Sequence, residues 1–191
     1  ESTGNLRYSQ TDFELSNGKL DYGLERTYNS RAGRNSMLGK GWSDSYHKEI
    51  YTKGTDTYFV DSDGSSFRFI KAGDTYACDE TKDYILTEEG SGYLITGKDD
   101  TTYKFNRYGQ LIRTEEPNGC RVVNVYDAIG RLVKVVSNED RSGQKTLKLE
   151  YDRENRYALS SIDLPDGTGL SYEQQGGELV SVTHSSGILS H

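Results

Sequence analysis

The sequence is short of basic residues and of long apolar runs, and both shortages exclude classes of partner. Its 23 Lys and Arg residues are outnumbered by 30 Asp and Glu, which gives a net charge of −7 and a pI near 5.0. Because binding to nucleic acid or to an anionic membrane requires clustered positive charge, neither partner is expected. No apolar stretch approaches the roughly 20 residues of a membrane-spanning helix, so membrane insertion is not expected.

Proline, cysteine and helical periodicity are also scarce. Two prolines stand beside 21 glycines, so turns are expected from residues that tolerate positive φ. Cys78 and Cys120 lack the spacing of a metal or redox motif, and a disulfide or two separate thiols both stay open. Apolar residues never hold the i, i+3, i+4, i+7 spacing of an amphipathic helix. Long helices are therefore not expected.

Tyrosine is what the sequence has in excess. Apolar residues make up only 32% of the chain, yet 15 tyrosines raise the aromatic share to 11%. Disordered chains are poor in aromatic and β-branched residues, so the composition indicates a folded β-rich protein. The start at Glu1 rather than methionine, without a signal peptide, suggests a fragment of a longer protein whose export signal lies elsewhere.

A Tyr-Asp turn motif recurs in the second half of the chain. Its clearest copy is Tyr126-Asp127-Ala128-Ile129-Gly130-Arg131-Leu132. Counted from the first aromatic residue, the four copies begin at Phe105, Tyr126, Tyr151 and Tyr172, which are 21, 25 and 21 residues apart. Such a period is typical of a repeat architecture, here two strands and two turns per unit. The residues assigned to this repeat are Phe105, Gly109, Leu111, Tyr126, Asp127, Gly130, Arg131, Leu132, Tyr151, Asp152, Asn155, Tyr172 and Gly176.

Each residue of the motif has an expected role in a hairpin. The tyrosine closes one strand, the aspartate accepts hydrogen bonds from turn amides, the glycine supplies the left-handed turn residue, and the leucine opens the returning strand. Tyrosines at equivalent positions are expected to form an aromatic ladder along the sheet. The pattern predicts turns at Gly109, Gly130, Asn155 and Gly176.

The first half of the chain predicts hairpins in a different register. Residues 58–69 alternate around Asp63-Gly64, and residues 84–95 alternate around Gly90-Ser91-Gly92. We therefore predict an all-β fold, a continuous antiparallel meander of hairpins forming a curved and twisted sheet. Its expected parts are an N-terminal module over residues 1–98 and repeat hairpins over 99–191, packed as one continuous sheet.

These motifs resemble those of bacterial Rhs/YD-repeat proteins, whose relatives include teneurins and the cocoon components of Tc toxins. The Tyr-Asp-x-x-Gly-Arg-Leu unit is the name-giving motif, and the N-terminal half resembles the module that opens the Rhs core. The residues that carry this second resemblance are Gly4, Asn5, Asp12, Arg26, Tyr28, Asn29, Gly39, Gly41 and Trp42. Arg26, Tyr28, Arg31 and Trp42 are expected to pack together, with arginine stacked over aromatic rings.

The resemblance implies a structural role. It predicts a scaffold segment of a secreted or cell-surface bacterial polymorphic toxin, contributing to a β-shell that encloses a C-terminal effector. The partners it implies are the rest of the parent protein and that effector. About four repeats are present, fewer than a closed shell needs, and the self-cleavage motif of such proteins has no match. Unpaired edge strands at either end predict self-association.

No residue pattern predicts catalysis or a cofactor. His47, His184 and His191 are isolated from any nucleophile motif, and no metal site or cofactor is expected. The acidic turn at Asp61-Ser62-Asp63-Gly64 lacks the later ligands of a calcium loop and is better explained as a hairpin turn. We therefore expect no enzyme. The alternative that stays open is a module binding cell-wall or host glycans through Tyr and Trp rings.

Overall fold

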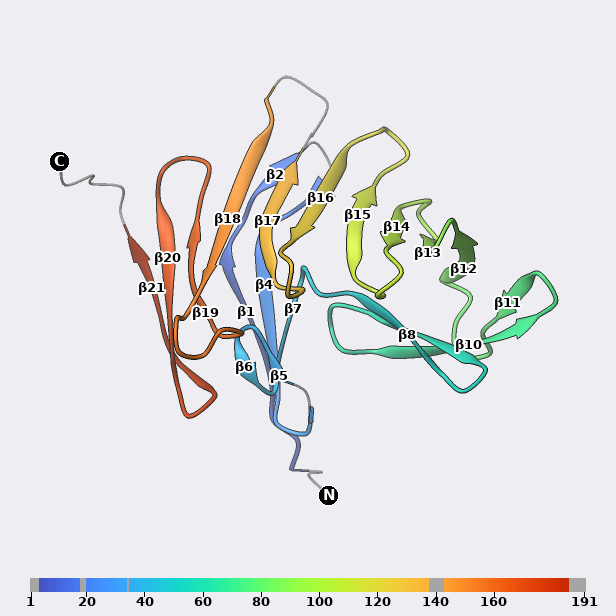
Figure 1. Cartoon of the computed structure of the whole chain (residues 1–191), viewed down its shortest axis with the longest axis horizontal. Helices are drawn as coiled ribbons and strands as arrows, with labels where there is room; N and C mark the ends of the chain where they lie inside the picture. The colour runs from blue at the N-terminus through green and yellow to red at the C-terminus, as the bar shows by residue number, and fades with distance from the viewer. Residues whose placement is uncertain (1–3, 18–19, 34, 138–142, 186–191) are drawn as a thin grey trace.

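A computed structural model of the chain describes residues 4–17, 20–33, 35–137 and 143–185. These residues form strands and turns without a helix, which confirms the predicted all-β antiparallel fold. None of the described segments forms a helix long and apolar enough to cross a membrane. Figure 1 shows a row of long hairpins running from the green to the red end of the chain, with the N-terminal strands packed against it.

The row of hairpins is a ten-stranded antiparallel sheet in which every strand pairs with its neighbours in sequence. Its strands are β12 (Tyr84–Glu89), β13 (Gly92–Gly97), β14 (Thr102–Phe105), β15 (Leu111–Glu115), β16 (Arg121–Tyr126), β17 (Leu132–Ser137), β18 (Lys145–Tyr151), β19 (Leu159–Asp163), β20 (Gly169–Gln175) and β21 (Glu178–Ser185). The hairpin predicted around Gly90 is confirmed, because Glu89 pairs with Gly92 across its turn.

The N-terminal residues form smaller sheets. One is three-stranded and joins β1 (Arg7–Phe13), β4 (Leu24–Asn29) and β7 (Trp42–Asp44). A second is four-stranded, with the order β11-β10-β9-β8, from β8 (Glu49–Lys53), β9 (Asp56–Val60), β10 (Ser66–Ala72) and β11 (Thr75–Ala77). Two short hairpins pair β2 (Ser16–Asn17) with β3 (Leu20–Asp21), and β5 (Asn35–Ser36) with β6 (Gly39–Lys40). The β9–β10 pair confirms the hairpin predicted around Asp63-Gly64.

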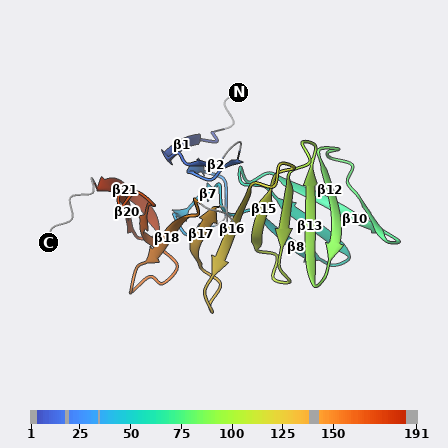
Figure 2. The same ribbon diagram turned by 90° about the horizontal axis from the view of Figure 1, so that it is seen from above.

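The small sheets cover one face of the long sheet, so the molecule has two layers. In Figure 2 the blue strands β1 and β2 lie on one side of the long sheet, and the cyan strands β8 and β10 are seen behind its green part. The division between residues 98 and 99 stays a proposal about sequence modules, since the long sheet itself begins at Tyr84.

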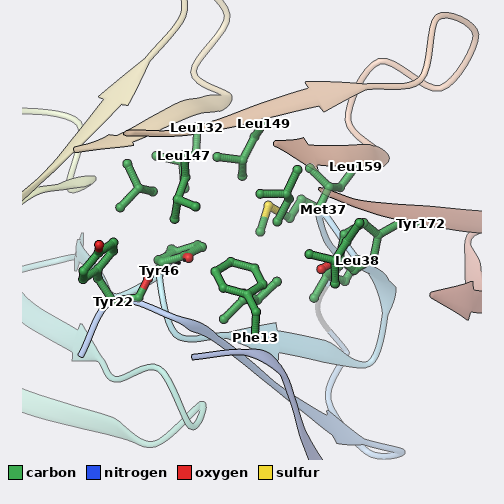
Figure 3. Packing of buried hydrophobic residues seen from close by; sticks show 14 of the residues in the cluster. Phe13, Tyr22, Met37, Leu38, Tyr46, Leu132, Leu147, Leu149, Leu159 and Tyr172 are labelled. Carbon is green, nitrogen blue, oxygen red and sulfur yellow. Dashed lines mark hydrogen bonds between the residues drawn. The ribbon is translucent and has the colours of Figure 1, made fainter. Parts of the chain in front are cut away.

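Two apolar clusters fill the space between the layers. The larger one joins Phe13, Leu38 and Tyr46 of the N-terminal part to the leucines of β17–β20, and Figure 3 shows these side chains converging from both layers. The smaller one joins Ile50, Phe59 and Phe69 of the four-stranded sheet to inward-facing residues of β12–β15, including Leu86 and Ile95. Cys78 belongs to this second cluster. Cys78 and Cys120 are both free thiols, which settles the open question of their pairing.

The first repeat turn is locked to the covering layer through the backbone. The Ile50 amide donates to the Gly109 carbonyl at 2.9 Å, and a Cβ placed on Gly109 would lie 1.7 Å from the Ile50 carbonyl oxygen. Gly109 also has a φ of +77°, which L side chains rarely adopt. Two separate constraints therefore require glycine at this position.

We expect Gly109→Ala to destabilise the protein by more than about 3 kcal/mol, because a backbone clash adds to the strain of positive φ. Gly64→Ala is the matched control. Its φ is +85° but no atom lies within 4 Å of the added Cβ, so it should cost only about 1–2 kcal/mol. Urea unfolding followed by circular dichroism measures both values. Equal losses in the two variants would show that the Ile50 contact does not constrain the turn.

Candidate functional site: repeat turns and the N-terminal module

The acidic or amide residue that follows the aromatic residue caps its own turn in the first three copies of the motif. The Asp127 side-chain oxygen accepts hydrogen bonds from the Ile129 and Arg131 amides at 3.1 and 2.9 Å. Asn106 does the same in the first copy, where its Oδ1 accepts from Tyr108 and Gln110. Desolvation raises the pKa of Asp127, but the hydrogen bonds from these amides and from Arg131 outweigh it, and the net pKa is lowered. The carboxylate therefore stays ionised and accepts these bonds. These contacts are Asx turns, which is why Asp and Asn are favoured here.

The tyrosine of each central repeat reaches back to the preceding one. The Tyr126 hydroxyl donates to the Leu111 carbonyl at 2.9 Å, and the Tyr151 hydroxyl donates to the Leu132 carbonyl at 2.8 Å. In both cases the acceptor belongs to the leucine that opens the returning strand of the previous turn. Burial raises the pKa of Tyr126 and of Tyr151, so both hydroxyls remain protonated donors. The ladder is therefore held by polar contacts between repeats.

The residue before the motif leucine reaches forward. Gln110 Nε2 donates to the Gly130 carbonyl at 3.0 Å, and Arg131 Nη1 donates to the Arg156 carbonyl at 2.8 Å. The Arg131 guanidinium also lies 4.9 Å from the centre of the Tyr151 ring. Asp127 fixes this arginine through a 2.7 Å bond to its Nε. One turn thus positions the side chain that contacts the next turn.

The third and fourth copies depart from this pattern. The third turn is longer, because Tyr151 pairs with Leu159, and Asn155 lies in it without a positive φ. In the fourth hairpin the residue that pairs opposite the motif leucine, Leu179, is Gln174. The sequence register that placed Tyr172 at the equivalent position is therefore displaced by two residues. The β-bulge before Gln174 matches the bulges before Phe105 and Tyr126, but the residue at this position is not aromatic and the loop is shorter, since Gln175 pairs with Glu178.

Tyr172 instead contacts a buried ion pair of the N-terminal module. Its hydroxyl donates to Asp12 Oδ2 at 3.0 Å, and Arg26 Nε binds both oxygens of Asp12 at 2.8 and 3.0 Å. The side chains of Asp12 and Arg26 are only 3% and 12% exposed. Burial and the charge of Asp12 raise the pKa of Tyr172, so it stays a donor. Sequence reasoning assigned Asp12 and Tyr172 to different motifs and did not predict their contact.

Aromatic rings pack against the arginine of this ion pair. The Arg26 guanidinium lies 4.6 Å from the centre of the Trp42 ring, and the Tyr28 and Trp42 rings are 5.3 Å apart. Gly41 leaves room for this arrangement, since a Cβ there would lie 2.7 Å from Tyr28 Cε2. Arg26, Tyr28 and Trp42 therefore come together in space. Arg31 follows nearby in the chain, where its amide donates to Asn29 Oδ1 at 3.0 Å.

The remaining residues of the N-terminal motif hold the chain near β1 and β4. Asn5 Oδ1 accepts a bond from the Ser30 hydroxyl at 3.1 Å, and the Asn29 amide donates to the Gly41 carbonyl at 2.8 Å. Gly4 has a φ of +64° with open space around it.

The β5–β6 hairpin docks on the ends of the last two repeats. The Met37 carbonyl accepts from the Leu159 amide at 2.8 Å and from Gln174 Nε2 at 2.7 Å. The Lys40 amide donates to the Gly177 carbonyl at 2.8 Å. A Cβ on Gly39 would lie 2.6 Å from that same carbonyl oxygen, so the close approach requires glycine.

His47 lies in the loop that leads from β7 to β8 and pairs with a buried carboxylate. His47 Nδ1 lies 2.7 and 2.8 Å from the two oxygens of Asp44, whose side chain is fully buried. Burial lowers the pKa of His47, but the charge and hydrogen bond of Asp44 and the charge of Glu49 outweigh it, and the net pKa is raised above 6.5. His184 is exposed on β21, and His191 lies outside the described residues.

The described residues hold no group of three or more His, Cys, Asp or Glu side chains that could bind a metal ion. At the acidic turn, Asp61 instead binds Lys48 and accepts a 2.6 Å bond from the Tyr84 hydroxyl. The glycan alternative is not favoured, because the rings of Trp42, Tyr126 and Tyr151 take part in internal contacts.

Comparisons with known proteins agree with both sequence motifs. Residues 2–69 match the family described as Domain of unknown function (DUF6531). The chain is 30% identical over 205 residues to the probable deoxyribonuclease RhsB of Dickeya dadantii (strain 3937), which covers 90% of the chain and 14% of the relative. It is 28% identical over 109 residues to the tRNA nuclease WapA of Bacillus subtilis (strain 168), covering 56% of the chain and 5% of the relative. The chain thus spans only a small part of these relatives.

We expect Asp12→Ala to destabilise the protein by about 3–5 kcal/mol, because it leaves the Arg26 charge buried without its partner. Replacing both residues, as Asp12→Leu with Arg26→Met, should cost less than the single change. Lys98→Ala is the control, since the Lys98–Asp83 pair is 73% and 55% exposed and should change stability by less than about 0.5 kcal/mol. Denaturant unfolding measures all three. A single-variant loss as small as that of the control would contradict a stabilising role for the pair.

The His47–Asp44 pair predicts a pH dependence of stability. Because folding raises the pKa of His47, its contribution is complete below pH 6.5 and is lost as the pH rises through the folded-state value. We expect the free energy of unfolding to fall as the pH rises above 6.5, and to fall less in His47→Gln. His184→Gln serves as the control and should keep the wild-type slope. Identical slopes in wild type and His47→Gln would disprove the assignment to this pair.

Proposed function

We propose that this chain, which is a segment of the Rhs/YD-repeat family, is a structural part of a larger toxin protein and not its catalytic part. The observation that supports the proposal is that the motif side chains bind their own turn or a neighbouring repeat. Asp127 caps its turn, Tyr126 bonds to the repeat before it, and Arg131 bonds to the repeat after it. The residues that define the motif therefore serve cohesion between repeats.

The relatives support a role in a toxin protein and suggest that the nuclease activity belongs to another part of that protein. Their printed names describe a tRNA nuclease and probable deoxyribonucleases, yet the chain spans between 5% and 15% of their length. We infer that a nuclease effector of the parent lies in another part of that protein. The proposed partners are the rest of the parent and its C-terminal effector, and the proposed location is secreted or on the cell surface.

The proposed role of the N-terminal module is to cover the first repeats of the shell. The strands before Tyr84 pack on one face of β12–β21, where Phe13, Leu38 and Phe59 fill the space between the layers. Because this face is already filled, the space that holds the effector would be enclosed by further repeats of the parent protein. Self-association of the isolated chain through the outer edges of β12 and β21 stays a prediction.

The test compares the chain with its full-length parent. The purified chain should cleave neither tRNA nor DNA. In the parent, Asp12→Ala should increase release of the effector region in limited proteolysis, because the covering module is loosened, whereas Lys98→Ala should not. Cleavage of either nucleic acid by the purified chain would overturn the assignment as a non-catalytic part. An Asp12→Ala parent whose module is destabilised but whose effector stays equally protected would overturn the shell role.

A further inference from the structure

A pocket of about 630 Å³ lies where the β5–β6 hairpin meets the turns of the second, third and fourth repeats, at the ends of the strands labelled β17 to β21 in Figure 1. Its volume is within the range of small-molecule sites. The side chains that matter for its chemistry are Lys40, His47, Arg131, Tyr151, Tyr157 and Gln174. They come from both layers of the molecule, so the pocket exists only when the layers are docked.

The charge of this pocket is opposite to that of the whole protein. Three basic side chains line it, and no acidic residue of the described part of the chain does, although the net charge of the whole chain is −7. Glycines at positions 39, 130, 176 and 177 form part of the wall and leave backbone there without covering side chains. An anionic group is the ligand chemistry that such a lining favours.

Two of the cationic groups are held in place by carboxylates that do not line the pocket. Asp44 binds Nδ1 of His47, and Asp127 binds Nε of Arg131 at 2.7 Å. Lys40 is exposed, and its ammonium has no polar partner within the described part of the chain. Among the described residues, the arrangement therefore leaves the Lys40 charge without a partner, beside His47 and Arg131, which their carboxylates hold in place.

We propose that this pocket binds a small organic anion, a phosphate or carboxylate attached to a flat apolar body. The anionic group interacts with Lys40, His47 and Arg131, and the apolar body lies against the ring of Tyr157, which is 58% exposed. Gln174, whose Nε2 is already bound to the Met37 carbonyl, fixes the opposite wall. This inference is independent of the scaffold role, since it depends only on the docked layers.

The test uses phenyl phosphate as the probe and nuclear magnetic resonance of the backbone amides. Phenyl phosphate should shift the amide signals of Gly39, Gly130 and Gly177, and Lys40→Gln should weaken binding about tenfold, as expected for the loss of one charge-assisted contact. Lys134→Gln, an exposed position on β17 away from the pocket, is the matched control and should leave the affinity unchanged. Thermal unfolding of both variants verifies that they are folded.

Three results would overturn the proposal. The first is an absence of shifts at these glycines with about 10 mM phenyl phosphate. Any affinity would then be too weak for a functional small-molecule site. The second is equal binding of benzyl alcohol, which lacks the anionic group. The third is equal binding of inorganic phosphate, which would assign the pocket to the oxyanion alone and remove the organic part of the ligand.

Discussion

The structure depends on covering one apolar face of an open sheet. Seven buried leucines point from β12–β20 toward the N-terminal layer, among them Leu86, Leu132 and Leu170. Burying each contributes about 1.5–3 kcal/mol, so together they exceed about 10 kcal/mol, which equals the whole net stability of a typical domain. The ten-stranded sheet therefore could not present that face to water and stay folded. The two small N-terminal sheets are required by the repeats that they cover.

Polar groups fix the position of one layer relative to the other. Apolar packing alone allows many sliding positions, but buried donors and acceptors are costly unless each meets its partner. Tyr172 must reach Asp12, Asn124 Nδ2 must reach the Tyr46 carbonyl at 3.3 Å, and the Gly109 turn must meet the backbone of Ile50. These contacts lie at separate strands of the long sheet. Displacement along any strand would break several of them together.

Local features were predictable from the sequence, whereas contacts between layers were not. Asx residues followed by glycine predicted the hairpins at Asp63 and Gly130 because turn chemistry depends on neighbouring residues alone. The covering layer was not predicted, since its contacts join residues as distant as Asp12 and Tyr172, 160 positions apart. The fourth repeat was placed in the wrong register because the copies were aligned on their aromatic residues, and Gln174 stands at the aromatic position of this copy. The β-bulge itself lies at the same place in all four repeats.

The departures from the repeat pattern occur where the N-terminal module docks. In the third repeat the forward-reaching arginine is replaced by Ala158, and the next residue, Leu159, donates its amide to the Met37 carbonyl. In the fourth, glutamine stands in place of tyrosine, and Gln174 binds that same carbonyl. Partners that a neighbouring repeat supplies elsewhere are here supplied by the β5–β6 hairpin. The irregular copies thus exchange contacts between repeats for contacts with the β5–β6 hairpin, whereas the first copy keeps the motif and meets the covering layer through the backbone of Gly109.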